Sequence, residues 1–186
     1  DNLIIQIYDH GSLIADVAFC LEEYTIPLAP ANDDCAEATP LTVNTDLSCN
    51  SVTSGTLEGA TNSGVSDNGA GTPNDDVWYR FTATSTNHDI EIKNISGNTT
   101  NLVHEVFSGA CGSLVSLNVS DPNINSVSSL TIGAEYYVRV FSFDNIEGRN
   151  TTFEVCVGVP LPAPANDDCA EATPLTVNTD LSCNSV

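Results

Sequence analysis

Residues 77–84 read Val-Trp-Tyr-Arg-Phe-Thr-Ala-Thr, and this stretch carries the clearest structural signal in the chain. Val77, Tyr79 and Phe81 occupy alternate positions along it, with Trp78 between the first two. Because successive side chains of a β-strand point to opposite faces of a sheet, this alternation predicts a strand with a continuous apolar face. Aromatic and β-branched residues, which favour strands, dominate the stretch. It therefore predicts a central strand of a packed sheet.

Further segments on both sides have a similar strand-like composition. Turn-forming Gly, Asn, Asp and Pro residues separate them, and the Gly-, Asn-, Ser- and Asp-rich stretch 59–75 predicts a long loop. No helical period is longer than two turns, and one short helical turn is expected at 33–39, capped by Asn32 or Asp33. These features predict an all-β fold, a two-sheet antiparallel β-sandwich of jelly-roll type. The predicted strands besides 77–84 are 88–94, 102–108, 127–132, 135–143 and 151–158, with 40–44 and 52–57 as weaker candidates.

The chain contains an internal repeat. Residues Ala31–Val52 recur letter for letter at Ala165–Val186, an offset of 165 − 31 = 134 residues. One β-sandwich domain has about this size. A Pro- and Ala-rich segment precedes each copy, at 27–30 and at 160–164. Such segments favour extended polyproline II and act as semi-rigid spacers, so we expect tandem repeats joined by Pro-rich linkers.

The repeat divides the chain into three parts. Residues 1–30 are expected to be the last strands and linker of a preceding repeat, 31–164 one complete repeat, and 165–186 the start of the next. No leader segment is evident at the start, so the sequence is expected to be an excerpt of a longer mature protein.

The charge of the chain restricts its partners. Four Lys and Arg residues stand against 25 Asp and Glu residues, a formal net charge of −21. Such a surface repels phosphate backbones, which excludes nucleic acid as a partner. Membrane insertion is not expected either, because no apolar run approaches the ~20 residues that span a bilayer. A hydrophobic content of 41% argues against disorder.

The cysteines point to an oxidising compartment. There are seven cysteines and no Cys-x-x-Cys pair, a usage that favours disulfides over a zinc site or a redox motif. Disulfides place the protein outside the cell or in a periplasm. We expect Cys35–Cys49 and Cys111–Cys156 within one repeat, Cys169–Cys183 in the next, and a partner for Cys20 outside the chain. The rival scheme pairs Cys20–Cys35, Cys49–Cys111 and Cys156–Cys169 across the linkers and leaves Cys183 unpaired. Both schemes account for the odd number.

No catalytic motif is present. A nucleophile elbow, a His-Glu-x-x-His zinc site and a Cys–His pair are all missing from the sequence, so we do not expect an enzyme. Calcium is the one cofactor that the sequence favours, because aspartates in loops offer the hard oxygen ligands that it prefers. The alternative is that these aspartates cap turns and solvate the surface. The candidate ligands are Asp33, Asp34, Asp67, Asp75 and Asp76.

Four stretches carry a resemblance to a known family: 74–81 (NDDVWYRF), 107–114 (FSGACGSL), 135–140 (EYYVRV) and 31–36 (ANDDCA). They resemble the bacterial pre-peptidase C-terminal (PPC-like) β-sandwich, in the form found in large surface adhesins exported by type IX secretion, including gliding-type adhesins. The resemblance implies an extracellular location on a bacterial cell surface, and calcium bound near the N-terminal segment in some relatives. Relatives often carry a second cysteine soon after the CGSL motif. Here residues 116–118 read Ser-Leu-Asn, so Cys111 needs another partner.

These observations favour a structural and adhesive repeat of an extracellular bacterial surface fibre. Its partners would be neighbouring copies or repeats of itself, with surface glycans as a further class. In one variant of this hypothesis, neighbouring units complete each other's sheets by strand addition. The alternative is a carbohydrate- or protein-binding accessory module of a secreted hydrolase, and a secreted enzyme fragment is the weakest of the three hypotheses.

Overall fold

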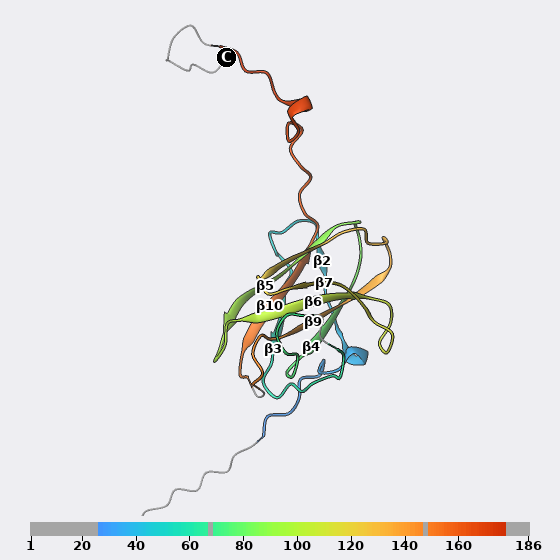
Figure 1. The fold of residues 1–186 in the computed structure, drawn as a ribbon, viewed down its shortest axis with the longest axis vertical. Helices are drawn as coiled ribbons and strands as arrows, with labels where there is room; N and C mark the ends of the chain where they lie inside the picture. Colours follow the sequence, from blue (N-terminus) through green and yellow to red (C-terminus); the bar gives the residue numbers. More distant parts are fainter. Residues whose placement is uncertain (1–25, 67–68, 147–148, 178–186) are drawn as a thin grey trace, which may run out of the picture.

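The computed structural model describes residues 26–66, 69–146 and 149–177. Within these ranges the chain forms ten β-strands and two short 3-10 turns, and the strands build two sheets packed face to face (Figure 1). The prediction of an all-β two-sheet sandwich is confirmed. In the same ranges, no helical segment has the length and apolar character needed to cross a membrane.

The first sheet is built around β9. Its order is β1, β4, β9, β6 and β7. Trp78 of β4 lies opposite Arg139 of β9, and Arg139 lies opposite Glu105 of β6 on the other side. These three residues therefore form a row across the middle of the sheet. The strands are β1 (Thr39–Pro40), β4 (Val77–Thr82), β6 (Leu102–Ser108), β7 (Val115–Ser120) and β9 (Glu135–Ser142).

The second sheet is built around β10. Strand β5 pairs along one edge of β10 and is flanked by β8, whereas β3 and β2 share the other edge of β10. Strand β3 pairs with the beginning of β10 and β2 with its end. The strands are β2 (Val43–Asn44), β3 (Thr53–Thr56), β5 (His88–Ser96), β8 (Ile124–Val127) and β10 (Thr152–Gly158).

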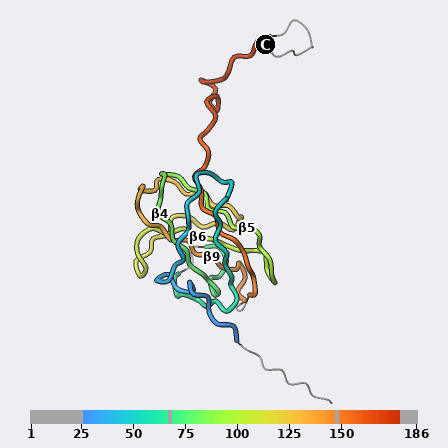
Figure 2. The backbone as a smooth tube through the Cα atoms, turned by 180° about the vertical axis from the view of Figure 1, so that it is seen from behind, coloured from blue at the N-terminus to red at the C-terminus, as the bar shows by residue number. Residues whose placement is uncertain are grey.

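Most strand pairs are antiparallel, as predicted, and two are parallel. Strand β1 runs parallel to β4 in the first sheet, and β2 runs parallel to β10 in the second. The two-residue step between β1 and β2 carries the chain from one sheet to the other. Figure 2 shows the blue and cyan chain running along the length of the sandwich in this region. We call residues 31–44 the entry segment.

Most predicted strands are found, with two errors. The segments 77–84, 88–94, 102–108, 135–143 and 151–158 correspond to β4, β5, β6, β9 and β10, and the weak candidates to β1, β2 and β3. The prediction of a strand at 127–132 is wrong, because β8 ends at Val127 and a turn follows it. Strand β7 was not predicted. The predicted helical turn is present as the 3-10 turn η1 (Cys35–Glu37), but Asp34 occupies its N-cap position and makes no side-chain cap bond.

The main core lies between the two sheets. The alternation along β4 places Tyr79 and Phe81 in it, where they pack on side chains from β5 and β10 such as Ile90 and Val155. Gly55 of β3 allows this packing, since a Cβ atom there would lie 2.0 Å from the Tyr79 hydroxyl. The loop that joins β3 to β4 contains no strand among its described residues and crosses the outer face of the first sheet, where the carbonyl groups of Val65 and Ser66 contact Arg139.

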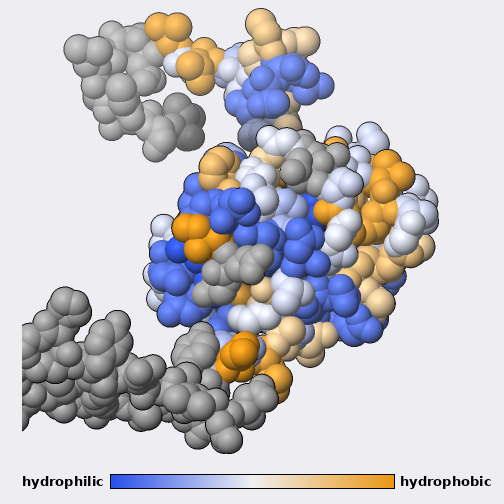
Figure 3. Space-filling model, turned by 60° about the horizontal axis from the view of Figure 1, so that its bottom comes forward, coloured by the Kyte–Doolittle hydropathy of each residue, from blue (hydrophilic) through white to orange (hydrophobic). Residues whose placement is uncertain are grey.

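The chain enters and leaves at opposite ends of the sandwich (Figure 1). Residues 26–30 pass beside Gly59, where a Cβ atom would lie only 2.5 Å from the Leu28 carbonyl oxygen, so the linker packs closely on this end. Residues 159–177 extend away from the other end and contain the second 3-10 turn, η2 (Cys169–Glu171). On the face shown in Figure 3, apolar side chains are interspersed with hydrophilic ones.

Candidate functional site

The entry segment docks first through the residues of its Ala-Asn-Asp-Asp-Cys motif. The Trp78 backbone N–H donates to the Asn32 carbonyl oxygen at 2.8 Å, and Asn32 Nδ2 donates to the Trp78 carbonyl oxygen at 2.8 Å. The Asp33 carboxylate accepts from the Thr61 N–H at 2.7 Å and from the Thr61 hydroxyl at 2.6 Å. The motif therefore fixes the entry segment to β4 and to the loop that precedes it.

The rest of the entry segment completes one edge of each sheet. The Leu41 N–H donates to the Arg80 carbonyl oxygen at 2.8 Å, and Asn44 Nδ2 donates to the Val157 carbonyl oxygen at 3.0 Å. Ala38 and Leu41 are buried, with 5% and 9% of their surface exposed. Burial of apolar side chains and backbone pairing in both sheets thus hold the segment in place.

The disulfides correct the predicted pairing. The structure contains Cys35–Cys111 and Cys49–Cys156, with Cα–Cα distances of 5.7 and 5.6 Å. The expected pairs Cys35–Cys49 and Cys111–Cys156 are both wrong, because the chain changes sheets between Cys35 and Cys49. Cys35 thus lies on the first sheet and Cys49 beside β10 of the second. The rival pairing of Cys49 with Cys111 is excluded for the same reason.

The remaining cysteines lie outside residues 31–164. Cys169 is exposed and forms no disulfide with any cysteine among the described residues. Its predicted partner Cys183 and Cys20 lie outside those residues, so the Cys169–Cys183 pair and a partner for Cys20 outside the chain stay predictions. The rival pairs Cys20–Cys35 and Cys156–Cys169 are excluded, because Cys35 and Cys156 pair with other cysteines. Each of the two disulfides found ties part of the repeated stretch 31–52 to the body of the sandwich.

Arg139 forms the centre of a second, outer core on the first sheet. Its side chain is fully buried, and its guanidinium carbon lies 5.6, 5.3 and 5.2 Å from the ring centroids of Trp78, Phe107 and Phe141. Arg139 Nη2 donates to Glu105 Oε2 at 2.6 Å, and its Nη1 lies 3.5 Å from Asp76 Oδ2. Two carboxylates and three aromatic faces thus surround one guanidinium, an arrangement that stabilises a buried cation.

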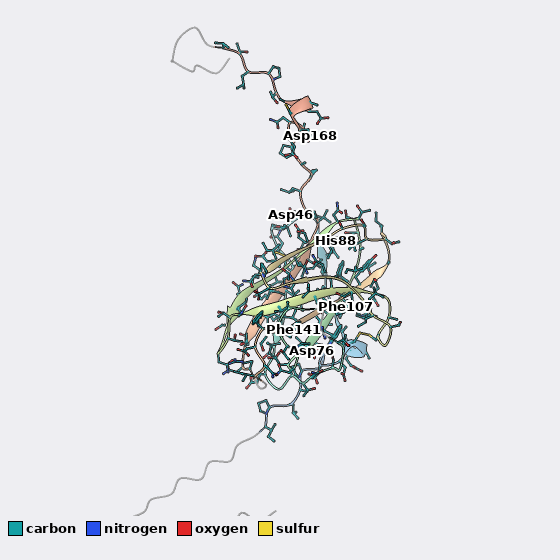
Figure 4. The ribbon with its side chains drawn as sticks, in the orientation of Figure 1. Asp46, Asp76, His88, Phe107, Phe141 and Asp168 are labelled. Atoms are coloured by element: carbon teal, nitrogen blue, oxygen red, sulfur yellow. A yellow bond between two sulfur atoms is a disulfide. The ribbon has the colours of Figure 1, made fainter. Side chains whose placement is uncertain are left out.

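Backbone groups of the long loop complete the environment of Arg139. Its Nη1 donates to the Val65 carbonyl oxygen at 2.7 Å, and its Nη2 donates to the Ser66 carbonyl oxygen at 3.0 Å. Arg139 therefore fastens the loop between β3 and β4 onto the outer face of the first sheet. Figure 4 labels Phe107, Phe141 and Asp76 in this part of the molecule.

Asp75 and Asp76 are fully buried beside this cluster. Burial is the largest cause that raises the pKa of each carboxyl above its ordinary value. Hydrogen bonds oppose the rise, since Asp75 accepts from the Ser142 N–H at 2.9 Å and Asp76 accepts from the Ser63 N–H at 2.8 Å and hydroxyl at 2.6 Å. For Asp76, the neighbouring Arg139 also lowers the pKa. Both carboxylates therefore hold the loop in place.

A surface depression lies above the outer core, next to η1 and the Cys35–Cys111 disulfide. Its volume is about 760 Å³, which is within the range of small-molecule sites. Phe107, Val65 and Leu114 supply apolar lining, and carboxylates and hydroxyls surround them. The polar lining residues include Asp34, Glu37, Ser63, Ser66, Ser113 and Ser116.

The four predicted calcium ligands that lie among the described residues do not form one metal site. Asp33 is engaged by Thr61, and Asp76 by Ser63 and Arg139. Asp34 lines the depression, and Asp67 lies outside the described residues. Asp75 differs from these, because its Oδ2 is buried without a hydrogen-bond partner, as is Oδ1 of the adjacent Asn74. Among residues 26–66, 69–146 and 149–177, no group of three or more His, Cys, Asp or Glu side chains is arranged to hold a metal.

The outer core was not predicted from the sequence, although a signal was present. A charged residue lies in the interior of each of two largely apolar strands, Glu105 in β6 and Arg139 in β9. A charged residue in such a position is rarely buried unless it is paired. If two such strands are neighbours, their opposite charges indicate a buried ion pair. The sequence does not reveal which strands are neighbours, so it could not predict this pair.

Two solved structures are similar to the chain at low identity. One is the pre-peptidase C-terminal domain of a collagenase from Bacillus anthracis, at 18% identity and a TM-score of 0.38, covering 64% of this chain and 93% of that one. The other is the Aeromonas hydrophila protein PliG, a periplasmic inhibitor of g-type lysozyme, at 14% identity and a TM-score of 0.33, covering 67% and 98%. The comparison with curated proteins gives no match.

A family model matches most of the chain. Residues 31–155 match the model described as galactose binding domain-like, whose family is associated with type IX secretion. The match begins at the entry segment and ends within β10, so it covers the sandwich that the structure contains. The expected resemblance to β-sandwich domains of type IX-secreted proteins is confirmed. The chain belongs to the type IX secretion-associated family of galactose-binding-domain-like proteins.

Proposed function

We propose that this chain is a non-catalytic structural and adhesive repeat of an extracellular bacterial surface fibre. One observation carries the proposal. The linker enters one end of the sandwich, and the chain leaves the other end toward a second, identical copy of the entry sequence (Figure 1). Sandwiches connected in this way form a string in which each unit adds its full length, and stacked repeats of this kind behave as a one-dimensional array.

The internal construction of the sandwich suits an exposed fibre. Two disulfides span 76 and 107 residues of sequence and tie the stretch 31–52 to the body of the domain. Crosslinks that close long loops stabilise a fold strongly, and they persist in oxidising surroundings. The family's association with type IX secretion supports a secreted or cell-surface location.

Electron microscopy of the native protein, released from cells without reduction, tests this proposal. We expect long fibres with a regular axial repeat that corresponds to one sandwich. Reduction before imaging should leave the path of the chain intact but make the fibres more susceptible to heat and protease. Discrete globular particles, with this domain beside a larger body, would contradict a fibre role.

The second candidate function is a carbohydrate- or protein-binding accessory module of a secreted hydrolase. The depression beside η1 favours it, because hydroxyls and carboxylates around an apolar floor suit a neutral polyhydroxy ligand. The family's description as galactose-binding-like points the same way. Ser113 lines the depression, whereas Ser54 is exposed on β3 outside it.

A glycan array with two variants tests this second function. Ser113→Trp fills the depression and should abolish any glycan signal, whereas the matched variant Ser54→Trp should leave the signal unchanged. Equal loss in both variants, or no signal with the unmodified chain, would remove the depression as a glycan site.

A further inference from the structure

The depression beside η1 carries two carboxylates that are not engaged by the rest of the described chain. Asp34 and Glu37 both line it, and both residues are exposed. Neither carboxylate forms a hydrogen bond or an ion pair with another residue that the structure describes. They differ in this from Asp33 and Asp76, whose carboxylates are hydrogen-bonded to the long loop. The charges of Asp34 and Glu37 are therefore available to a ligand.

No cation in the described part of the chain lies where it could neutralise the depression. Among the described residues that line it, none is Lys, Arg or His. The sequence contains four Lys and Arg residues, and each of them is paired with a carboxylate outside the lining. In a chain with a net charge of −21, the depression thus favours a cationic group on its ligand. The pairs are Arg80–Glu135, Lys93–Glu91, Arg139 with Glu105 and Asp76, and Arg149–Asp144.

The floor of the depression determines which kind of cation fits. Val65 and Leu114 are half-buried and pack with Phe107 in the outer core. Phe107 is only 2% exposed, so its ring offers no open face on which a sugar could stack. A flexible apolar stem can instead lie along Val65 and Leu114. A Lys side chain combines such a stem, of four methylene groups, with a terminal ammonium group.

Hydroxyl groups around the depression suit the backbone of a peptide. Ser66 and Ser116 line it, and neither side chain has a hydrogen-bond partner among the described residues. Because a hydroxyl can both donate and accept, these two can bond to the N–H and C=O groups of an extended chain. The volume of about 760 Å³ also leaves room for the residues that flank the lysine. The polar and apolar linings therefore fit one ligand, a lysine within a peptide.

We propose that the depression binds a Lys side chain from an extended segment of a partner protein. The ammonium group lies between Asp34 and Glu37, and the stem lies on Val65 and Leu114. This inference rests on the second candidate function, the accessory binding module, and it states the protein-binding form of that function together with the chemistry of the partner. It requires no fibre.

The test follows the amide signals of the full chain by nuclear magnetic resonance while a peptide is added. The peptide is Gly-Ser-Lys-Ser-Gly with blocked ends, so that lysine carries its only charge. A second peptide has Nε-acetyl-lysine instead, which keeps the stem and removes the charge. At about 0.15 M salt, where the Debye length is about 8 Å, attraction by distant carboxylates is largely screened. We expect the lysine peptide to shift signals around η1 and Ser113, and the acetylated peptide to bind at least tenfold more weakly.

A pair of double variants separates the depression from the general charge. Asp34→Asn/Glu37→Gln should weaken binding of the lysine peptide about tenfold, because the ammonium group loses both ionised partners. The variant should keep the fold, since neither carboxylate is bonded to a described residue. The matched control Glu58→Gln/Asp121→Asn removes two exposed charges outside the depression and should weaken binding less than about twofold.

Equal weakening in the two double variants would show that net charge attracts the peptide, and the proposal would be wrong. It would also be wrong if the acetylated peptide bound equally well, or if the shifted signals lay away from η1 and Ser113. If neutral glycans occupy the depression and the lysine peptide does not, the carbohydrate form of the second function holds and this inference fails alone. If neither ligand binds, the second function fails with it. Microscopy of the fibres is independent of all these outcomes.

Discussion

Arg139 Nη2 lies 2.6 Å from Glu105 Oε2 on the outer face of the first sheet, and neither side chain is accessible to solvent. Asp76 and three aromatic rings complete the surroundings of this pair. An ion pair in such a position loses the hydration of both partners. The pair therefore fixes the arrangement of the long loop on the sheet more than it adds net stability.

Replacing Arg139 by Met should destabilise the sandwich by about 3–5 kcal/mol, because two buried carboxylates then lose their cation. Urea denaturation followed by Trp78 fluorescence measures the loss. The matched control is Arg80→Met, since Arg80 and Glu135 form an exposed pair with 43% and 40% of their side chains accessible. We expect a change below about 1 kcal/mol there. Equal losses in both variants would contradict the special role of Arg139.

The two disulfides should each contribute about 4–5 kcal/mol, since both close long loops. The double variants Cys35→Ser/Cys111→Ser and Cys49→Ser/Cys156→Ser are expected to lower the free energy of unfolding by this amount. The matched control Cys169→Ser removes an exposed thiol and should change it by less than about 0.5 kcal/mol. A Cys35–Cys49 peptide in a non-reducing digest would contradict the pairing found here.

His104 should make the stability of the sandwich dependent on pH. Burial lowers its pKa to about 4 from the ordinary value of 6.5. Between these values the unfolded chain binds more protons than the folded chain, so the stabilisation present above pH 6.5 is lost as the pH falls toward 4. The loss amounts to roughly 3 kcal/mol. Asp75 and Asp76, whose pKa values are raised, act in the opposite direction, because they favour the folded state most when the pH is low.

Urea denaturation between pH 7 and 4 with the variant His104→Leu isolates this contribution. We expect the unmodified chain to lose stability over this range and the variant to lose clearly less. The variant His88→Leu serves as a comparison. Burial also lowers the pKa of His88, but this ring is hydrogen-bonded to the backbone of Gly158 and of Thr84. An unchanged pH profile in His104→Leu would show that His104 is not responsible.

The sequence predicts which residues form strands better than it predicts which strands pair with one another. Alternation identifies β4 and β9 because one face of each meets the main core. Strand β7 was not predicted because it lies at the edge of a sheet. Val115 and Leu117 are exposed there, and the register shifts opposite Phe107, so the strand lacks a regular alternation of buried and exposed residues. The disulfide pairing was not predicted correctly, because the short spacing between Cys35 and Cys49 favours a bond that closes a short loop. In the structure the entry segment crosses between the sheets before Cys49, which separates these two cysteines. Burial of Arg139 likewise depends on β6 and β9 being neighbours.

Calcium remains a prediction, and the buried oxygen of Asp75 that lacks a hydrogen-bond partner makes Asp75 the candidate ligand tested first. Asp33 accepts hydrogen bonds from Thr61 at both carboxylate oxygens. Asp76 accepts a hydrogen bond from the Ser63 hydroxyl and pairs with the Arg139 guanidinium. Asp75 Oδ2 is buried without a partner beside Asn74 Oδ1. Burying an unpaired carboxylate oxygen is costly, and a cation that prefers oxygen ligands would offset this cost.

We expect millimolar calcium to raise the melting temperature of the unmodified chain by a few degrees, relative to a chelator, in differential scanning calorimetry. Asp75→Asn should remove the increase, because the amide keeps the size of the side chain but lacks its charge. Asp33→Asn is the matched control and should retain it, since its oxygens are engaged by Thr61. Magnesium at the same concentration should have little effect, because it dehydrates reluctantly and demands a stricter octahedral geometry. If the melting temperature rises equally in both variants, the effect comes from general screening of the 25 acidic residues. If the melting temperature of the unmodified chain does not rise, Asp75 does not bind calcium and its role is structural.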